Sequence, residues 1–305
     1  MSKIVLYLLP FFLSALPGVP RQTDSAEINR HVRFLAAISP ARNHKYPASL
    51  DTAARYISAE LKKFSVKSRD QLFEVAGKKY RNVIANIGPA YAERIVVGAH
   101  YDACGDQPGA DDNASGVAGL LLLASYLSGA HTALKYNYEL VFYSLEEPPH
   151  FRTEYMGSAV HAKSLKADGA QIKYMLSLET IGYFSDKPDS QSYPPVLGWF
   201  YPSEGNFIAA VGRRADADLL RSFKTAFQQH SSLKIITLAA PSFVTGIDFS
   251  DHLNYWKYGW SAAMVTDTAF MRNHNYHEIS DTPDTLDYEK IVLVIRGVFG
   301  AVTAP

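Results

Sequence analysis

Several apolar runs in this chain are followed at once by histidine or acidic side chains, and this feature most constrains the fold. The runs are 94–99 before His100, 138–145 before Glu146 and Glu147, and 172–178 before Glu179. Their length and apolar character are typical of buried parallel strands. Because ligands bind at the carboxyl ends of strands in open α/β sheets, we expect these side chains to converge at one edge.

Helical patterns lie between these runs. Apolar residues recur at helical spacing over 50–64, and 115–127 is apolar almost all round, which predicts a buried helix. The other predicted elements are strands at 82–87 and 262–266 and helices at 156–165, 216–230 and 287–302. Alternating strands and helices predict an α/β sandwich with a largely parallel sheet, formed as a single domain over residues 23–305.

Charge and cysteine content exclude several classes of protein. The 30 Lys+Arg balance 30 Asp+Glu, so we expect no nucleic-acid partner. The single cysteine, Cys104, excludes an internal disulfide framework and a cysteine-based structural zinc site. Alone in its loop, Cys104 is expected to be inert, whereas ten histidines leave His/Asp/Glu metal chemistry open.

The N-terminus is typical of a targeting segment. Lys3 precedes an apolar run, 4–19, that Pro10 and Pro17 interrupt. A membrane-spanning helix needs roughly 20 apolar residues, so this run is short and broken. We expect residues 1–22 to be a signal peptide, which places the protein in the periplasm or outside the cell, free of the membrane after cleavage. Because no clean A-x-A cleavage pattern appears, an uncleaved anchor and a misassigned start remain alternatives.

A loop rich in Gly, Asp and Asn, 105–116, follows the first of these strands. Asp111 and Asp112 stand there just before the buried helix, where they could simply cap it. Their closeness to His100 instead favours zinc or a similar divalent ion. Near the C-terminus, His274 is expected to be a surface residue, and local sequence leaves His277 equally open to a surface or a metal-binding role.

Seven sequence segments resemble, in order and spacing, the zinc aminopeptidase family of bacterial leucyl-aminopeptidase type. They are GAHYD (98–102), GADDNASG (109–116), SLEEPP (144–149), YMGS (155–158), SLETIGYF (177–184), SDH (250–252) and YHEISDTPDTLDYEKI (276–291). The resemblance covers roughly residues 31–302. It implies a three-layer α-β-α sandwich with a mixed, largely parallel central sheet, and two zinc ions bridged by one carboxylate.

The resemblance also implies which residues bind metal. His100 and Glu179 would hold one zinc ion, Glu147 and His277 the other, and Asp112 would bridge the two. Many members of the family carry Asp where this chain carries Glu179, so the spacing and preference of the metals stay open at that position.

Further roles follow from the same resemblance. Glu146 would be the general base toward the attacking water, and Tyr276 would donate a hydrogen bond to the developing oxyanion. Asp102 would orient the His100 ring. The peptide bond between Asp112 and Asn113 would be cis.

Residue chemistry adds a few expectations. Neighbouring residues of a strand point to opposite faces, so Glu146 and Glu147 can both serve the site only if the chain turns there. The prolines at 148–149 supply such a break. Asp251 is given a supporting role and His252 is left open. Arg272 could either anchor a substrate carboxylate or form a structural salt bridge.

The expected function is that of a metal-dependent exopeptidase, an aminopeptidase acting on peptides with a free N-terminus. Two alternatives stay open: a glutaminyl cyclase using a single zinc ion, and a non-catalytic binding protein that has kept the fold. Because fold alone does not fix the substrate, carboxypeptidases and amidohydrolases of this fold also stay open. The sequence does not determine the oligomeric state.

Overall fold

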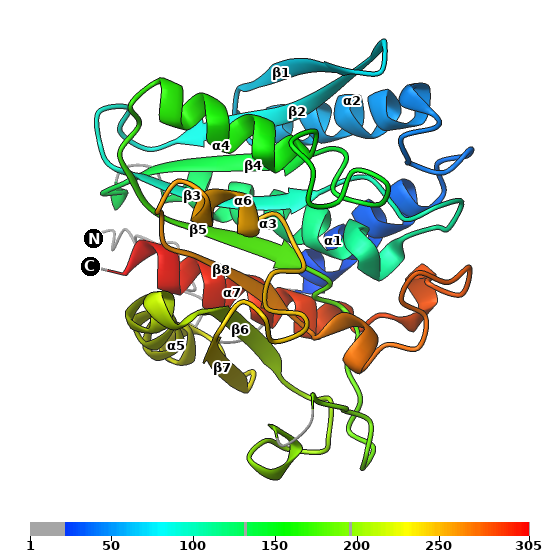
Figure 1. Ribbon diagram of the computed structural model, residues 1–305, viewed down its shortest axis with the longest axis vertical. Coiled ribbons are helices and arrows are strands. Elements are labelled where there is room, and N and C mark those ends of the chain that lie inside the picture. The colour runs from blue at the N-terminus through cyan, green and yellow to red at the C-terminus, as the bar shows by residue number, and fades with distance from the viewer. Residues whose placement is uncertain (1–21, 131–132, 195–196, 305) are drawn as a thin grey trace, which may run out of the picture.

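The computed structural model describes residues 22–130, 133–194 and 197–304 (Figure 1). The predicted signal peptide falls outside these residues except for Gln22, which opens the first helix. The helices are α1 (Gln22–Ala36), α2 (Pro47–Lys63), α3 (Gly116–Gly129), α4 (Gly157–Ala167), α5 (Ala217–His230), α6 (Leu253–Trp256) and α7 (Tyr288–Thr303). No helix within the described ranges has both the length and the apolar character needed to cross a bilayer.

Eight strands form one sheet in the order β1-β2-β4-β3-β5-β8-β6-β7. They are β1 (Ser68–Val75), β2 (Lys78–Ile87), β3 (Arg94–His100), β4 (Asn137–Tyr143), β5 (Ile172–Glu179), β6 (Ile208–Arg213), β7 (Ile235–Ala240) and β8 (Ala262–Thr266). Four of the seven strand pairings are parallel and three are antiparallel. The predicted mixed, largely parallel sheet is confirmed.

Helices cover both faces of this sheet. Apolar residues of α1, α2, α3, α5 and α7 form the main core on one face. A smaller cluster joins α4 and α6 to the other face, and Figure 1 shows these two helices in front of the sheet. The arrangement is the three-layer α-β-α sandwich expected from the sequence.

The central strands β4, β3, β5 and β8 are parallel neighbours, so their carboxyl ends lie along one edge. The strands are almost fully buried there because helices pack on both faces. Polar side chains just beyond these ends are therefore held on a rigid support, which is where a binding site gains precision.

Candidate metal centre

Five predicted ligands converge at this edge around the carboxylate of Asp112. Its Oδ1 lies 3.3 Å from Nε2 of His100, and its Oδ2 lies 3.1 Å from Nε2 of His277. His100 Nε2 is also 3.3 Å from Glu179 Oε2, and His277 Nε2 is 3.3 Å from Glu147 Oε2. Asp112 thus stands between two groups of ligand atoms and faces each with a different oxygen.

These separations match what a metal ion requires. Bonds of about 2.0–2.1 Å to zinc place two ligands of one tetrahedral ion about 3.3–3.4 Å apart. Several of the atoms concerned are buried and form no hydrogen bond: both oxygens of Asp112, Oε1 of Glu147 and Nε2 of His277. Buried polar atoms normally have partners, so a divalent ion would satisfy a need that the protein leaves unmet.

The electrostatics of the cluster reflect the same crowding. Burial alone would lower the pKa of His100 and His277, but the surrounding carboxylates raise both above the ordinary value. Burial opposes ionisation of Asp112, yet the two imidazoles lower its pKa. Burial and the charge of Asp112 raise the pKa of Glu147 to about 8. A metal ion that binds here would therefore have to compete with protons for the side chains of His100, His277 and Glu147.

A turn after β4 lets Glu146 and Glu147 both reach the site. Leu145 adopts a left-handed backbone with φ 61°, a conformation that costs a residue with a side chain about 1–3 kcal/mol and that clusters at functional sites. The Asp102 carboxylate holds the turn by accepting hydrogen bonds from the backbone N–H of Glu146 at 3.2 Å and of Glu147 at 3.0 Å. The chain therefore already turns at Leu145, ahead of the two prolines.

Asp102 also contacts His100, as predicted. Its Oδ1 lies 3.4 Å from Nδ1 of the ring, on the side away from Asp112. The same carboxylate thus lies beside the imidazole and accepts hydrogen bonds from the backbone of the two glutamates.

The loop that carries Asp112 is braced by side chains that the sequence analysis did not select. Asp281 accepts hydrogen bonds from the backbone N–H of Asp111 and of Asp112. Buried Arg42 donates to the carbonyls of Tyr101, Pro108 and Gly109. No local pattern marks Arg42, whereas Asp281 lies inside the segment SDTPDT and could have been chosen.

Asn113 ties this loop to the end of β5. Its Oδ1 accepts hydrogen bonds from the backbone N–H of Gly116, as a helix cap would, and of Thr180, while its Nδ2 donates to the carbonyl of Leu178. The peptide bond between Asp112 and Asn113 is cis, as expected.

Glu179 is held by a neighbour that sequence reasoning missed. Ser250 Oγ donates to Glu179 Oε2 at 2.8 Å. The next residue, Asp251, is fully buried, and burial raises its pKa to about 7 in the field of His100 and Glu179. Asp251 is therefore a buried carboxylate close enough to the cluster to feel its charges, and its supporting role stays a prediction.

The remaining candidates fall into clear places. The Tyr276 ring stacks on His277 with centroids 3.9 Å apart, and it lines the cleft in front of the cluster. His274 is exposed, and His252 is a core residue whose Nε2 donates to the carbonyl of Ile247. Buried Arg272 donates to Gln191 Oε1 and to the carbonyls of Tyr183 and Phe207, so it serves the structure.

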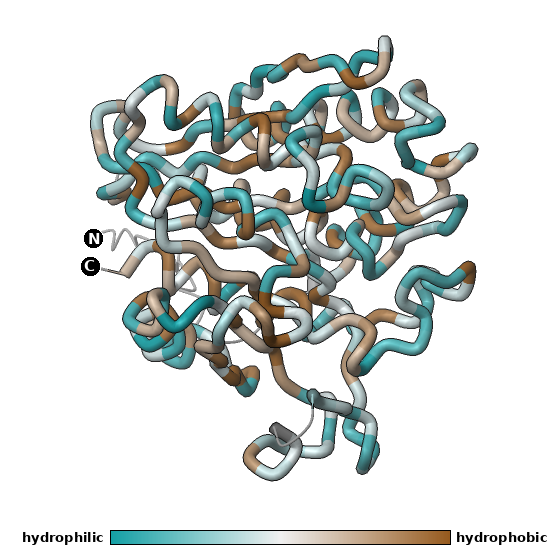
Figure 2. The backbone as a smooth tube through the Cα atoms, in the orientation of Figure 1, coloured by the Kyte–Doolittle hydropathy of each residue, from teal (hydrophilic) through white to brown (hydrophobic). Residues whose placement is uncertain are grey.

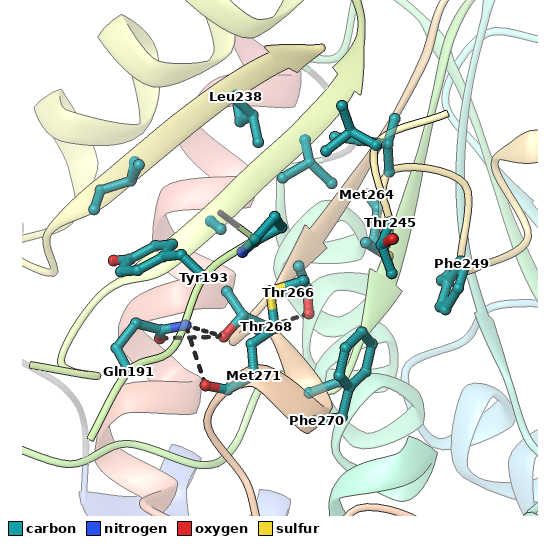
Figure 3. Close-up of a pocket in the computed structure, with 18 of the residues that line it drawn as sticks. Gln191, Tyr193, Leu238, Thr245, Phe249, Met264, Thr266, Thr268, Phe270 and Met271 are labelled. Carbon is teal, nitrogen blue, oxygen red and sulfur yellow. Dashed lines mark hydrogen bonds between the residues drawn. The ribbon is translucent and has the colours of Figure 1, made fainter. Parts of the chain in front are cut away.

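Two cavities with common lining residues lie in front of the cluster. A cleft of about 270 Å³ is lined by the carboxylates of Asp112, Glu146, Glu147 and Glu179. A second cavity of about 90 Å³, called the inner cavity below, shares the lining residues Glu179, Phe249, Phe270 and Tyr276 with the cleft. Figure 3 shows the second cavity, with Phe249 and Phe270 toward one side and Tyr193 and Leu238 toward the other.

The inner cavity is almost wholly apolar. It extends over β6, β7 and β8, where its walls are Ala209, Val211, Ile236, Leu238 and Met264. The tube in Figure 2 is hydrophobic along much of these strands. Among the described residues that line either cavity there is no Lys or Arg.

Comparison with known proteins identifies the family. Residues 82–302 match the family model "Peptidase family M28". The Escherichia coli protein YfbL, described as uncharacterized, is 42% identical over 97% of this chain and 94% of its own length. The chain belongs to peptidase family M28.

More distant relatives agree with this assignment. A probable leucine aminopeptidase of Arthroderma otae is 26% identical over 73% of this chain, which spans 56% of that longer protein. LapB of Legionella pneumophila has a TM-score of 0.71 at 21% identity and covers 92% of this chain and 72% of its own. A Fimbriiglobus ruber glutaminyl cyclase has a TM-score of 0.73 at 18% identity, and the match covers 93% of this chain and 96% of the cyclase. These two structures share the fold, and the family supports peptidase activity.

Proposed function

We propose that this protein is a zinc-dependent aminopeptidase with two metal ions. The observation that carries the proposal is the pair of short distances from the two oxygens of Asp112 to His100 and His277. Members of the family generally bind zinc. In this proposal His100, Glu179 and Asp112 hold one ion, and Glu147, His277 and Asp112 hold the other. When bound, zinc polarises a carbonyl oxygen and lowers the pKa of water.

Glu146 is the residue we assign to proton transfer. Its Oε2 lies 4.0 Å from His100 Nε2, and it lines the cleft, yet it is the one glutamate there that makes no close contact with either histidine. Burial raises its pKa well above the ordinary value. A carboxylate so placed can take a proton from the attacking water and return it to the leaving amine. Tyr276, beside His277, is assigned to donate its O–H to the developing oxyanion.

Charge supports the preference for a free N-terminus. Four carboxylates line the cleft, and neither cavity has a Lys or Arg among its described lining residues. A carboxypeptidase needs a positive group for the substrate's terminal carboxylate, and Arg272, which donates to Gln191 and two backbone carbonyls, is not among the lining residues of either cavity. A protonated terminal amine fits this cleft better than a carboxylate does.

A substrate panel tests the proposal. Leucyl anilide with a free amine should be hydrolysed by zinc-loaded protein, and the N-acetylated form should not. A chelator should abolish the activity, and zinc should restore it. Cyclisation of N-terminal glutamine with release of ammonia, and one zinc ion per chain, would instead support a glutaminyl cyclase. No turnover of any peptide with full metal content would support a binding protein.

The inner cavity predicts a preference for apolar N-terminal residues. Ala209 lies on the cavity wall, so Ala209→Leu should fill space that a substrate side chain would occupy. One methylene in such a pocket is worth about 10–200-fold in selectivity, so the leucyl-to-alanyl ratio of kcat/KM should fall at least about 10-fold. Leu72→Phe, at an exposed position of β1, is the control and should leave the ratio unchanged.

Acid should weaken the metal centre. His100 and His277 have raised pKa values without metal, so zinc must displace protons from them, and a lower pH favours the protonated side of that exchange. Zinc content after dialysis should therefore fall progressively as the solution is made more acidic, and activity should fall with it. Full zinc content and full activity in strong acid would contradict the ligand assignment.

The proposed location is the periplasm or the exterior, after removal of residues 1–22 as a signal peptide. The apolar run at 4–19 supports this proposal. Sequencing the N-terminus of the protein from its native host tests it, and an intact Met1 would argue for the uncleaved alternative.

A further inference from the structure

Cys104 lies beside one half of the metal centre. It belongs to the loop after β3, and its sulfur, a carboxylate oxygen of Glu147 and a ring nitrogen of His277 all lie within 4.8 Å of one another. These three groups come from distant parts of the sequence, since His277 lies in the C-terminal region beyond β8.

A second, independent feature points to a ligand in the same place. Glu147 is only 4% exposed, and its Oε1 forms no hydrogen bond. The other oxygen, Oε2, is the one that faces His277. Glu147, one of the two residues grouped with Cys104, therefore has one buried carboxylate oxygen without a partner.

The position of Cys104 relative to the cleft matters for what it could do. Glu147 and His277 line the cleft, whereas Cys104 is not among the lining residues. Cys104 therefore lies near Glu147 and His277 but outside the lining of the cleft that the substrate would occupy. A bond from its sulfur to a metal ion would leave the cleft side open.

We propose that Cys104 is a further ligand of the metal held by Glu147 and His277. The inference rests on the proposed metal centre. The thiol loses its proton to solvent, and the thiolate donates an electron pair to the ion. Thiolate is a soft ligand that favours zinc over magnesium, calcium or manganese.

This assignment makes the two halves of the centre unequal. Asp112, Glu147, His277 and Cys104 would give one ion four protein ligands, the number found in closed structural zinc sites. The other ion would have three, His100, Glu179 and Asp112, and would keep a position for water or substrate, as catalytic zinc sites do. Glu146, the proposed base, lies on that three-ligand side, 4.0 Å from His100 Nε2.

The experiment follows the thiol itself. Because Cys104 is the chain's single cysteine, an aromatic disulfide reagent, whose disulfide is attacked by thiolates, reports on this residue alone. Metal-free wild-type protein should react, and zinc loading should slow the reaction at least about 10-fold, since the sulfur's electron pair is then committed to the metal. Co²⁺-loaded wild-type protein should show a sulfur-to-cobalt charge-transfer band, and Co²⁺-loaded Cys104→Ser should lack it.

Metal affinity provides the second readout. Cys104→Ser should weaken the binding of one zinc ion by about 10-fold or more, at least as much as changing a residue that merely supports a ligand. The other ion should bind nearly as before. His274→Ser, an exposed histidine in the same C-terminal region, is the control and should leave both affinities unchanged.

The outcomes separate this inference from the proposed function. If wild-type protein binds two ions but its thiol reacts equally fast with and without zinc, and the cobalt band is absent, Cys104 is not a ligand and the metal centre still stands. If wild-type protein binds no metal, both proposals fail together. Should Cys104→Ser not fold, thiol protection and the cobalt band in the wild-type protein still decide the question.

Discussion

Glu146→Gln should lower turnover by about 10²–10⁴-fold, the usual contribution of a general acid–base group, while leaving the metal content unchanged. Glutamine keeps the size and reach of the side chain but cannot accept a proton from water. The residue lines the cleft, and the proposed ligand set does not include it. Steady-state kinetics on leucyl anilide and metal analysis of the same preparation give the two readouts.

The neighbouring residue is the matched control. Glu147→Gln removes a charge that lies 3.3 Å from His277 Nε2, so it should lose metal and with it activity. The two adjacent variants thus have opposite signatures. If the Glu146 variant lost its zinc, or hydrolysed peptides at a near wild-type rate, the assignment of Glu146 as the base and Glu147 as a metal ligand would be wrong.

The second large effect is expected from Asp112→Asn. This carboxylate faces both histidines, with Oδ1 toward His100 and Oδ2 toward His277. A neutral amide cannot supply an anionic oxygen to two ions at once. Zinc content should fall for both positions, and activity should drop by more than the roughly 10–100-fold that follows when a residue supporting a ligand is changed.

Asp111 offers the comparison for that experiment. It is buried, and its two oxygens accept hydrogen bonds from the backbone of Gly182 and from Asn273. Burial and the nearby carboxylate of Asp267 raise its pKa well above the ordinary value, and neither of its oxygens belongs to the proposed ligand set. Asp111→Asn should keep its zinc. If both variants lost metal equally, the effect would come from the fold of the loop rather than from a bridging ligand.

Sequence patterns predicted the strands that carry the chemistry because those strands are buried on both faces. The runs 94–99, 138–145 and 172–178 correspond to β3, β4 and β5, with ends shifted by at most two residues. Burial on both faces favours nearly continuous apolar residues, and the polar residues that follow mark the strand ends. The convergence of His100, Glu147 and Glu179 followed from the parallel arrangement alone.

Other elements were missed for physical reasons. Strand β6, Ile208–Arg213, is rich in small residues, and its partner β7, Ile235–Ala240, is partly exposed. Neither carries the strong signal of a central strand. Helix α1 buries Ile28, Val32 and Leu35 at helical spacing. This pattern lies directly after the predicted signal peptide, and no helix was predicted there.

The supporting residues of the site could be anticipated only in part. Arg42 contacts the loop over 59–67 positions of sequence separation, and no local pattern predicts such a pairing. Cys104 was expected to be inert because a lone cysteine in a loop is more often inert than a metal ligand. Its closeness to Glu147 and His277 depends on how the C-terminal segment folds back over the sheet edge.

The most direct test of the central claim is zinc-edge anomalous diffraction from crystals of the zinc-loaded protein. The account predicts two anomalous peaks on either side of the Asp112 carboxylate. One should lie within bonding distance of His100 and Glu179, and the other within bonding distance of Glu147 and His277. A single peak, or peaks that do not contact Asp112, would contradict the two-metal centre on which the proposed function depends.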